Sequence, residues 1–262
     1  MVFQIMTPMP IPSTPGKELA GTVALVTGAG QNIGRATALA LAAAGAAVAV
    51  NTRASREAAE AVVQEIHAAG GQAELCMADV ADAAQVQQMI DGVIARFGHI
   101  DILVLNASVR RETRFTDMSF EQWRVPLSIS LDGSFHCIKA CLPSMIAAGG
   151  GNIIALTGSN VLTGAVGKVH SSAAKSGLTG MIRALAREVG QHGIRANCVS
   201  PGMINTTRPS HRSARRDAKG LIPLERWGES GEIAATVRFL CGPGASYITG
   251  QTIHVNGGQT MF

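Results

Sequence analysis

The stretch Thr27-Gly28-Ala29-Gly30-Gln31-Asn32-Ile33-Gly34 decides the fold. It follows a short apolar run at residues 23–26 and precedes a segment, residues 34–44, whose pattern predicts a helix. Glycines between a strand and a helix let the backbone approach a pyrophosphate, and the helix N-terminus offers free N–H groups and a positive dipole end. The stretch therefore predicts a dinucleotide-binding turn at the carboxyl end of a first strand.

Apolar runs and amphipathic segments alternate along the rest of the chain. Predicted strands at 47–50, 73–77, 102–105, 153–156, 196–199 and 252–255 are separated by predicted helices at 55–69, 82–97, 120–148, 170–190 and 232–240. Asp82 is the expected N-cap of the third helix, and a break is expected in the long helix near Pro126. The alternation predicts an α/β Rossmann-type doubly wound sheet of about seven parallel strands, with helices on both faces.

The chain has one uniform composition after its first residues. No linker separates segments beyond residue 21, so residues 19–262 are predicted to form a single nucleotide-binding domain. Residues 1–18 carry four prolines, at 8, 10, 12 and 15, and are predicted to form a flexible N-terminal arm.

Composition argues against several classes of protein. Hydrophobic residues make up 47% and charged residues 15% of the chain, which is typical of a globular domain rather than a disordered one. Basic residues are dense only in 208–219, so no nucleic-acid partner is expected. Without a signal-peptide pattern or an apolar run of about 18 residues, a cytoplasmic protein with no membrane partner is expected. The five cysteines lack metal spacing, which favours free buried thiols and no metal site.

The end of the second predicted strand indicates which dinucleotide is bound. An acidic residue there would grip the ribose 2′-hydroxyl of NAD, whereas an arginine favours the 2′-phosphate of NADP. The sequence reads Asn51-Thr52-Arg53, with no acid and one arginine. NADP is therefore predicted in preference to NAD, although Arg53 can also be read as a solvated residue at a helix start.

Taken together, several motifs resemble those of the short-chain dehydrogenase/reductase family, in its ketoacyl-reductase-like branch, over residues 20–262. They are the glycine turn, Asp79-Val80, Asn106-Ala107, Pro201-Gly202-Met203-Ile204-Asn205-Thr206, Arg226-Trp227-Gly228, Ile248-Thr249-Gly250-Gln251 and Gly257-Gly258. The resemblance implies an NADP(H)-dependent oxidoreductase acting on a carbonyl or alcohol, assembled as a homodimer or homotetramer through the helices at 120–148 and 170–190.

The resemblance also implies a set of cofactor-binding residues. These are Gly28, Gln31, Asn32, Ile33, Gly34, Thr52, Arg53, Asp79, Val80, Asn106, Ala107, Ser108, Lys175, Pro201, Gly202, Ile204 and Thr206. Asp79 and Val80 would contact adenine, and Ile204 and Thr206 would hold the nicotinamide carboxamide. The chain departs from the family pattern at Asn32, where glycine is usual, and at Leu105 and Ser108, where asparagine and glycine are typical.

The catalytic positions match the family poorly. The family uses a tyrosine, a lysine four residues later, an upstream serine and an asparagine on the long helix. Here the lysine is Lys175, but Ser171, Gly158 and Ser130 stand at the other three positions. Ser159 can replace the upstream serine if the preceding loop is one residue shorter. Ser171 keeps a hydroxyl but is short, and His170 is either an acid that titrates near neutrality or a residue at the pocket rim.

Three functions remain open on these residues. The first is an oxidoreductase with a non-standard proton donor, the second a non-redox enzyme in the same pocket, and the third a catalytically silent cofactor-binding protein. Arginines at 110, 111 and 114 and in the 208–219 run favour an anionic substrate, a carboxylate or a phosphopantetheine carrier, unless they simply line a solvated loop.

Overall fold

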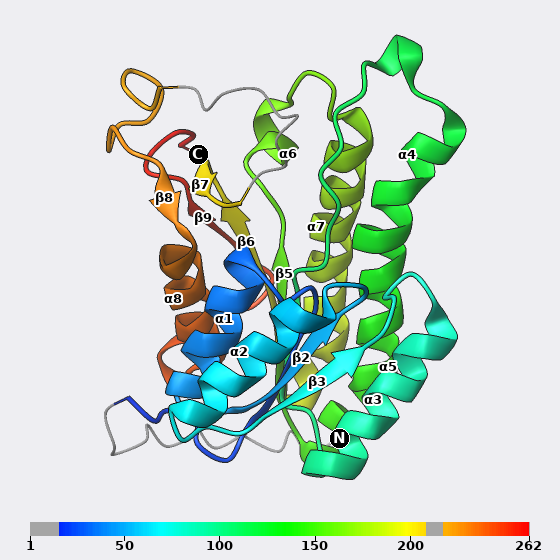
Figure 1. Ribbon diagram of the computed structural model, residues 1–262, viewed down its shortest axis with the longest axis vertical. Coiled ribbons are helices and arrows are strands. Elements are labelled where there is room, and N and C mark those ends of the chain that lie inside the picture. Colours follow the sequence, from blue (N-terminus) through cyan, green and yellow to red (C-terminus); the bar gives the residue numbers. More distant parts are fainter. Residues whose placement is uncertain (1–15, 208–216, 262) are drawn as a thin grey trace.

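The computed structural model describes residues 16–207 and 217–261, and its centre is a seven-stranded parallel sheet (Figure 1). The strand order is β3-β2-β1-β4-β5-β6-β9, which confirms the predicted doubly wound sheet. The strands are β1 (Val23–Val26), β2 (Ala47–Thr52), β3 (Ala73–Met77), β4 (Ile102–Leu105), β5 (Gly151–Leu156), β6 (Ile194–Pro201) and β9 (Thr252–Val255). The order reverses direction between β1 and β4, so the carboxyl ends of these strands form the crevice where such sheets bind ligands.

Helices cover both faces of the sheet (Figure 1). On one face lie α1 (Asn32–Ala43), α2 (Arg56–Ala68) and α8 (Ser230–Cys241), and on the other lie α3 (Ala83–Phe97), α5 (Gly133–Ala148) and α7 (Val169–Val189). The strands are apolar on both sides because each face packs against a helical layer. Val26 and Leu41 belong to the first core layer, and Leu103 and Ile182 to the second.

Helix starts follow local hydrogen bonding. The Asp82 side chain accepts hydrogen bonds from the backbone N–H groups of Ala84 at 2.9 Å and Gln85 at 3.2 Å, so the predicted N-cap of α3 is confirmed. Helix α1 begins at Asn32, two residues before the predicted start at 34. The glycine turn and the first turn of α1 therefore overlap, and no side chain caps the N-terminus of this helix.

The predicted long helix is a chain of three helical pieces. Helix α4 (Phe120–Leu127) continues through a π-helical segment, Ser128–Asp132, into α5. Pro126 lies inside α4 and has no N–H to donate, so the helical hydrogen bonding is interrupted close to the predicted break. The helix does not end there but continues through a π-helical turn, in which each N–H bonds to the carbonyl five residues earlier. Such π segments are common at functional sites.

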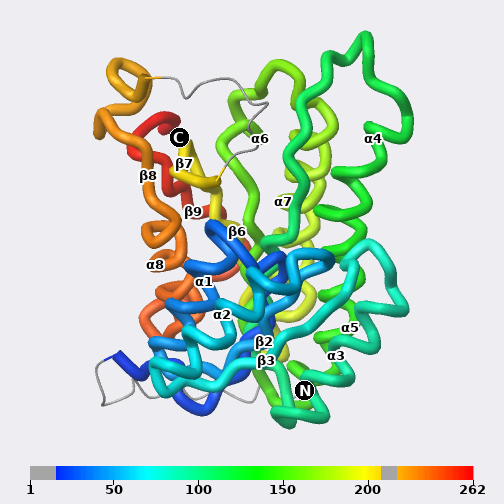
Figure 2. The backbone as a smooth tube through the Cα atoms, in the orientation of Figure 1, coloured from blue at the N-terminus to red at the C-terminus, as the bar shows by residue number. Residues whose placement is uncertain are grey.

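Three short elements near the carboxyl edge of the sheet were not predicted from the sequence. They are α6 (Asn160–Thr163) and a separate parallel pair formed by β7 (Ile204–Asn205) and β8 (Gly228–Glu229). Figure 2 shows β7 and β8 beside the end of β9, although they are far apart in sequence. Two-residue strands carry too little periodicity to be predicted, and short helical turns complete the chain at Phe115–Asp117, Gly190–His192 and Pro243–Ala245.

Other predictions concern the surface and the thiols. Within the described residues, no helix is both long and apolar enough to cross a bilayer, and no group of three metal-ligating side chains gathers. All five cysteines are free and four of them are buried, as predicted.

The Glu18 carboxylate pairs with the Arg238 guanidinium of α8 at 2.6 Å, so the end of the predicted arm contacts the domain, while residues 1–15 lie outside the described residues.

Candidate active site

The glycine turn is held by the end of the neighbouring strand β4. The Thr27 hydroxyl oxygen accepts hydrogen bonds from the backbone N–H groups of Asn106 at 2.9 Å and Ala107 at 3.0 Å. In return, the Asn106 side-chain amide donates to the carbonyl oxygens of Thr27 and Gly28, both at 2.9 Å. The sequence implied that Asn106 packs beside the cofactor, and the structure shows in addition that it fixes the shape of the turn.

Glycine is required at two positions of this turn. Gly28 has a φ of +62°, in the left-handed region that glycine adopts without strain. At Gly34, an added Cβ would overlap the Gly28 carbonyl oxygen and the Asn106 side-chain amide. The first turn of α1 can therefore approach the turn closely only because residue 34 has no side chain. This close approach leaves the uncapped N–H groups of α1 facing the place where a diphosphate would bind.

Asn51 connects the turn to two further strands. Its side-chain oxygen accepts from the Gly28 N–H at 3.3 Å, and its amide donates to the carbonyl oxygens of Cys76 at 3.1 Å and Ala78 at 3.2 Å. Asn51 is fully buried near the end of β2. The sequence reasoning used this residue only to note that no acid is present there. A polar residue at the end of an otherwise apolar strand was the signal that it has a structural role.

Asn32 joins the turn to the segment that follows β6. It has a φ of +53°, which explains why glycine is usual at this position in the family that the motifs resemble. Asparagine tolerates this conformation better than other residues with side chains. Its side-chain oxygen accepts a hydrogen bond from the Thr207 N–H at 2.7 Å, across 175 residues of sequence. The departure from glycine thus creates a bridge between two walls of the predicted cofactor groove.

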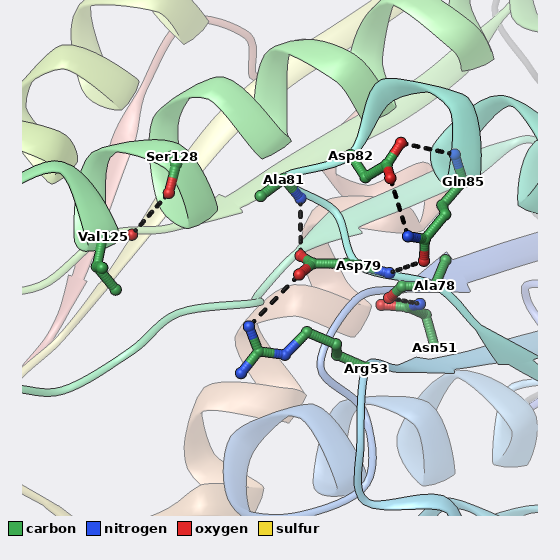
Figure 3. Close-up of polar contacts among 9 residues, drawn as sticks. All are labelled: Asn51, Arg53, Ala78, Asp79, Ala81, Asp82, Gln85, Val125 and Ser128. Carbon is green, nitrogen blue, oxygen red and sulfur yellow. Dashed lines mark hydrogen bonds and ion pairs between the residues drawn. The ribbon is translucent and has the colours of Figure 1, made fainter. Parts of the chain in front are cut away.

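The end of β2 carries one arginine and no carboxylate. Figure 3 shows Arg53 pointing toward Asp79, with a guanidinium nitrogen 3.4 Å from the carboxylate. Asp79 is fixed by the Ala81 N–H, which donates to its carboxylate at 3.0 Å, and by its own N–H, which donates to Gln85 at 3.0 Å. The Arg53 side chain remains 64% exposed, so its charge is accessible to a phosphate. These residues fit NADP, because a 2′-phosphate would find a cation and no acid from β2.

Lys175 is buried within α7 and held at the end of β5. Its Nζ donates a hydrogen bond to the Leu156 carbonyl oxygen at 2.5 Å. The pKa of Lys175 is lowered to about 8, mainly by burial and also by the positive charge of Arg110, while the Cys198 thiol acts in the opposite direction. Ser171 lies one helical turn earlier on the same face of α7 and is half-buried. The lysine is in place, but a serine hydroxyl at 171 is much shorter than a tyrosine.

The upstream serine position is occupied by Gly158, just beyond β5. A Cβ added there would lie 2.9 Å from the Asn160 side-chain oxygen, and the Asn160 amide donates to the Ser172 hydroxyl at 3.2 Å. Asn160, which the sequence reasoning missed, therefore lies against Gly158 and bonds in turn to Ser172. Ser159 comes next, and its N–H donates to the Pro201 carbonyl oxygen at 3.0 Å, directly before α6. Its catalytic role stays a prediction.

The other two candidate positions lie on α7 and in the π segment. Ser130 is buried in the π segment and donates to the Ser108 hydroxyl at 3.4 Å. His170 is also buried, and within residues 16–207 and 217–261 neither ring nitrogen has a hydrogen-bond partner. Burial, followed by the charge of Arg111, lowers the His170 pKa and favours the neutral ring. Being five residues from Lys175, His170 projects about 140° away around the helix.

The one tyrosine of the chain does not lie beside Lys175. The chain has a single tyrosine, Tyr247, and its side chain is fully exposed. Tyr247 precedes β9, and β9 runs parallel to β6 with Val255 opposite Pro201. Tyr247 therefore lies toward the amino-terminal edge of the sheet, away from the carboxyl edge that carries Lys175.

Arg110 connects the loop after β4 with the segment after β6. Its guanidinium donates to the Thr206 hydroxyl at 3.1 Å, and Thr206 is buried. Ile204 is buried in β7, and the Gly202 N–H donates to the Val255 carbonyl oxygen at 3.0 Å, which fixes the path of this segment. Arg114 and Lys219 are exposed. The remaining basic residues of the predicted substrate loop lie outside the described residues: Arg208, His211, Arg212, Arg215 and Arg216.

Comparisons with known proteins cover nearly the whole chain. The family model described as Enoyl-(Acyl carrier protein) reductase matches residues 28–260. A 3-oxoacyl-(acyl-carrier-protein) reductase of Synechocystis sp. is 43% identical over 245 residues, covering 93% of this chain and 99% of the relative.

Two solved structures have the same fold and were determined with a bound dinucleotide. A blue fluorescent protein from a metagenomic library, in complex with NADPH, has a TM-score of 0.87 and 36% identity over 93% of this chain and all of its own. A short-chain dehydrogenase from Burkholderia cenocepacia, in complex with NADP, has a TM-score of 0.87 and 32% identity over 92% of this chain and 99% of its own. The chain belongs to the short-chain dehydrogenase/reductase family, in its ketoacyl-reductase-like branch.

Proposed function

We propose that this protein is an NADP(H)-dependent oxidoreductase that interconverts a carbonyl and an alcohol with a proton donor other than tyrosine. One observation carries the proposal: the network that shapes the dinucleotide turn is complete, and Lys175 keeps its place at the end of β5 although the tyrosine is absent. A chain that bound no dinucleotide would have no reason to keep a buried lysine, which burial destabilises in its charged form.

NADP is the cofactor that the residues favour. Arg53 offers an exposed cation at the end of β2, and the structures with bound NADP and NADPH share the fold over more than nine-tenths of the chain. The bound cofactor would supply or accept a hydride. The chain itself would hold the diphosphate at the α1 N-terminus, place Lys175 beside the nicotinamide ribose, and close the groove with Thr206 and Ile204.

The substrate proposed here is a 3-oxoacyl thioester, or an anion of similar shape. This choice rests on the name of the 43% identical relative and on the exposed arginines that follow β4. Arginine suits planar anionic groups such as carboxylates and phosphates, which a phosphopantetheine carrier also presents. We further propose a homodimer or homotetramer formed through α4, α5 and α7.

Titration and turnover on the same preparation test the proposal. NADPH is expected to bind more tightly than NADH, and acetoacetyl thioesters are expected to oxidise NADPH with a loss of absorbance at 340 nm. The matched control is Lys175→Met, which keeps the side-chain length but removes the charge and should abolish turnover.

The other outcomes identify the alternatives. Product formation without a net change in NADPH would indicate a non-redox enzyme. Tight NADPH binding with no product from any carbonyl or alcohol would indicate a silent cofactor-binding protein. A failure to bind either dinucleotide would overturn the proposal altogether.

A further inference from the structure

Asn160, the first residue of α6, contacts α7 through both its side chain and its backbone. Its side-chain nitrogen lies 3.2 Å from the Ser172 hydroxyl oxygen, and that hydroxyl lies 3.4 Å from the Asn160 backbone carbonyl oxygen. A serine hydroxyl has one hydrogen, and a carbonyl can only accept. The Ser172 hydrogen therefore goes to the carbonyl, and the hydroxyl oxygen accepts from the amide. This pair of bonds fixes which end of the Asn160 amide faces α7.

The other end of the amide, the oxygen Oδ1, faces Gly158. A Cβ added to Gly158 would lie 2.9 Å from Oδ1 and, its chain neighbours aside, within 4 Å of no other described atom. Residues 16–207 and 217–261 supply no hydrogen-bond donor to Oδ1, and Asn160 is half-buried. The oxygen therefore borders an open space beside Gly158, with its lone pairs unused.

This space lies at the catalytic end of the crevice. Gly158 comes two residues after Leu156, whose carbonyl oxygen accepts a hydrogen bond from the Lys175 amine at 2.5 Å. Ser172 lies three residues before Lys175 on α7, directly after the position at which the family has its tyrosine. The Asn160 amide thus connects the strand end and the helix that carry the family's catalytic positions.

The exposed end of this amide selects for hydrogen-bond donors. An amide oxygen accepts hydrogen bonds and cannot donate them, so a ligand in the space must bring an O–H or N–H group. The alcohol form of a carbonyl and alcohol pair has an O–H on the reacting carbon, whereas the carbonyl form presents only lone pairs. Turning the amide over would leave two acceptors, Oδ1 and the Asn160 carbonyl, facing the single hydrogen of Ser172.

We infer that Oδ1 of Asn160 accepts a hydrogen bond from the hydroxyl of the alcohol substrate, in the space beside Gly158, and that Ser172 is the positioning residue that orients the amide. This inference rests on the proposed function. The serine that the family uses can both donate and accept, so it suits a carbonyl and an alcohol alike. A residue that only accepts makes the site selective for the alcohol form, here a 3-hydroxyacyl thioester.

Binding to the NADPH-loaded protein tests the inference without turnover, because NADPH cannot oxidise an alcohol. The probes are the 3-hydroxybutyryl and 3-methoxybutyryl thioesters of N-acetylcysteamine, of which only the first has an O–H. By calorimetric titration, the wild-type protein should bind the hydroxy probe about fivefold more tightly than the methoxy probe, as expected for one neutral hydrogen bond. Asn160→Leu, which is similar in shape, should lose this preference, and Asn160→Asp, which keeps an acceptor, should retain it.

Two further variants show whether the preference belongs to Asn160. Asn152→Leu makes the same change at the opposite end of β5, where the side chain bonds to the Cys241 carbonyl oxygen, and should keep the preference. Ser159→Ala removes the hydroxyl between Gly158 and Asn160. A wild-type protein without the preference, or a preference that persists in Asn160→Leu and disappears in Ser159→Ala, would overturn the inference.

Ser172 is tested through the orientation of the amide. Ser172→Ala leaves the Asn160 amide free to turn over, so it should weaken the preference for the hydroxy probe, and Ser172→Thr, which keeps the hydroxyl, should restore it. A structural role alone would lower stability without changing the ratio of the two dissociation constants. An unchanged ratio in Ser172→Ala would remove Ser172 from the inferred site.

Turnover separates this inference from the proposed function. Asn160→Leu should raise the KM for the 3-hydroxybutyryl thioester with NADP about fivefold and leave the KM for the acetoacetyl thioester with NADPH within about twofold. If the wild-type protein turns over neither thioester but shows the Asn160-dependent preference in binding, the proposed function fails and the inferred contact stands. If it turns over both, and Asn160→Leu changes neither the binding preference nor the KM for the alcohol, the function stands and the inference is wrong.

Discussion

The two halves of the crevice are built in different ways. Around the dinucleotide turn, buried side chains bond to backbone atoms: Asn106 to Thr27 and Gly28, and Asn51 to the turn after β1 and to the end of β3. Around the catalytic positions, Lys175 also bonds to a backbone carbonyl, but several side chains bond to one another, as Asn160 does to Ser172 and Arg110 to Thr206. Backbone-anchored geometry survives sequence change nearby, whereas a site built from side chains changes its chemistry with one or two substitutions. The first half carries the motifs of the family, and residues 130, 158 and 171 of the second half are a serine, a glycine and a serine.

Ser171→Tyr tests this contrast most strongly. If the rest of the catalytic half is competent, the added phenol should raise kcat by about 10²-fold, the lower end of what a positioned general acid contributes. Reductase turnover at 340 nm measures the change. The control is Ser176→Tyr, at an exposed position of the same helix. A variant that binds NADPH but gains nothing would show that more than the tyrosine has been lost.

Asn106→Leu tests the cofactor half. The substitution removes two hydrogen bonds to backbone carbonyls, and it should lower the free energy of unfolding by about 2 kcal/mol and weaken NADPH binding. Urea unfolding and NADPH titration measure the two effects. Asn152→Leu removes one hydrogen bond to the Cys241 carbonyl oxygen, at the amino-terminal edge of the sheet, and should cost stability without changing the Kd. Unaltered NADPH binding by Asn106→Leu would contradict the role of the turn network.

Arg53→Gln separates recognition of the 2′-phosphate from the shape of the turn. It should reduce the preference for NADPH over NADH by about tenfold, or about 1.4 kcal/mol, with NADH binding unchanged. The comparison variant is Arg56→Gln, an exposed arginine of α2 paired with Glu60. A ratio that stays constant in Arg53→Gln would assign the choice of dinucleotide to another residue.

Asn32→Gly should have the smallest effect, because two changes oppose each other. It restores the residue suited to a φ of +53° and removes the hydrogen bond to the Thr207 N–H. We expect little change in the free energy of unfolding and about a threefold faster release of NADPH, since one hydrogen bond is worth about 1 kcal/mol. Stopped-flow displacement measures the release rate. Slower release would mean that the Asn32 bridge hinders the cofactor rather than retaining it.

The sequence was informative where the chemistry depends on the backbone. The glycine turn, the alternation of strands and helices, and the Asp82 cap all follow from local rules, and the structure has each of them. It was less informative where an element is short or where its hydrogen bonding is irregular, as in the β7 and β8 pair and the π segment after Pro126. Neither has enough periodicity to be recognised from residue spacing.

By itself, the sequence determined the sheet and the family, because these depend on residue identity and on local pattern. The absence of tyrosine from position 171 can be read directly from the chain. Only the tertiary structure decided which distant residues meet at the carboxyl edge of the sheet. Arg110 and Thr206 are 96 residues apart, and Asn32 and Thr207 are 175 residues apart. Such contacts follow from the strand order, which places distant segments at one edge of the sheet and which no local pattern encodes.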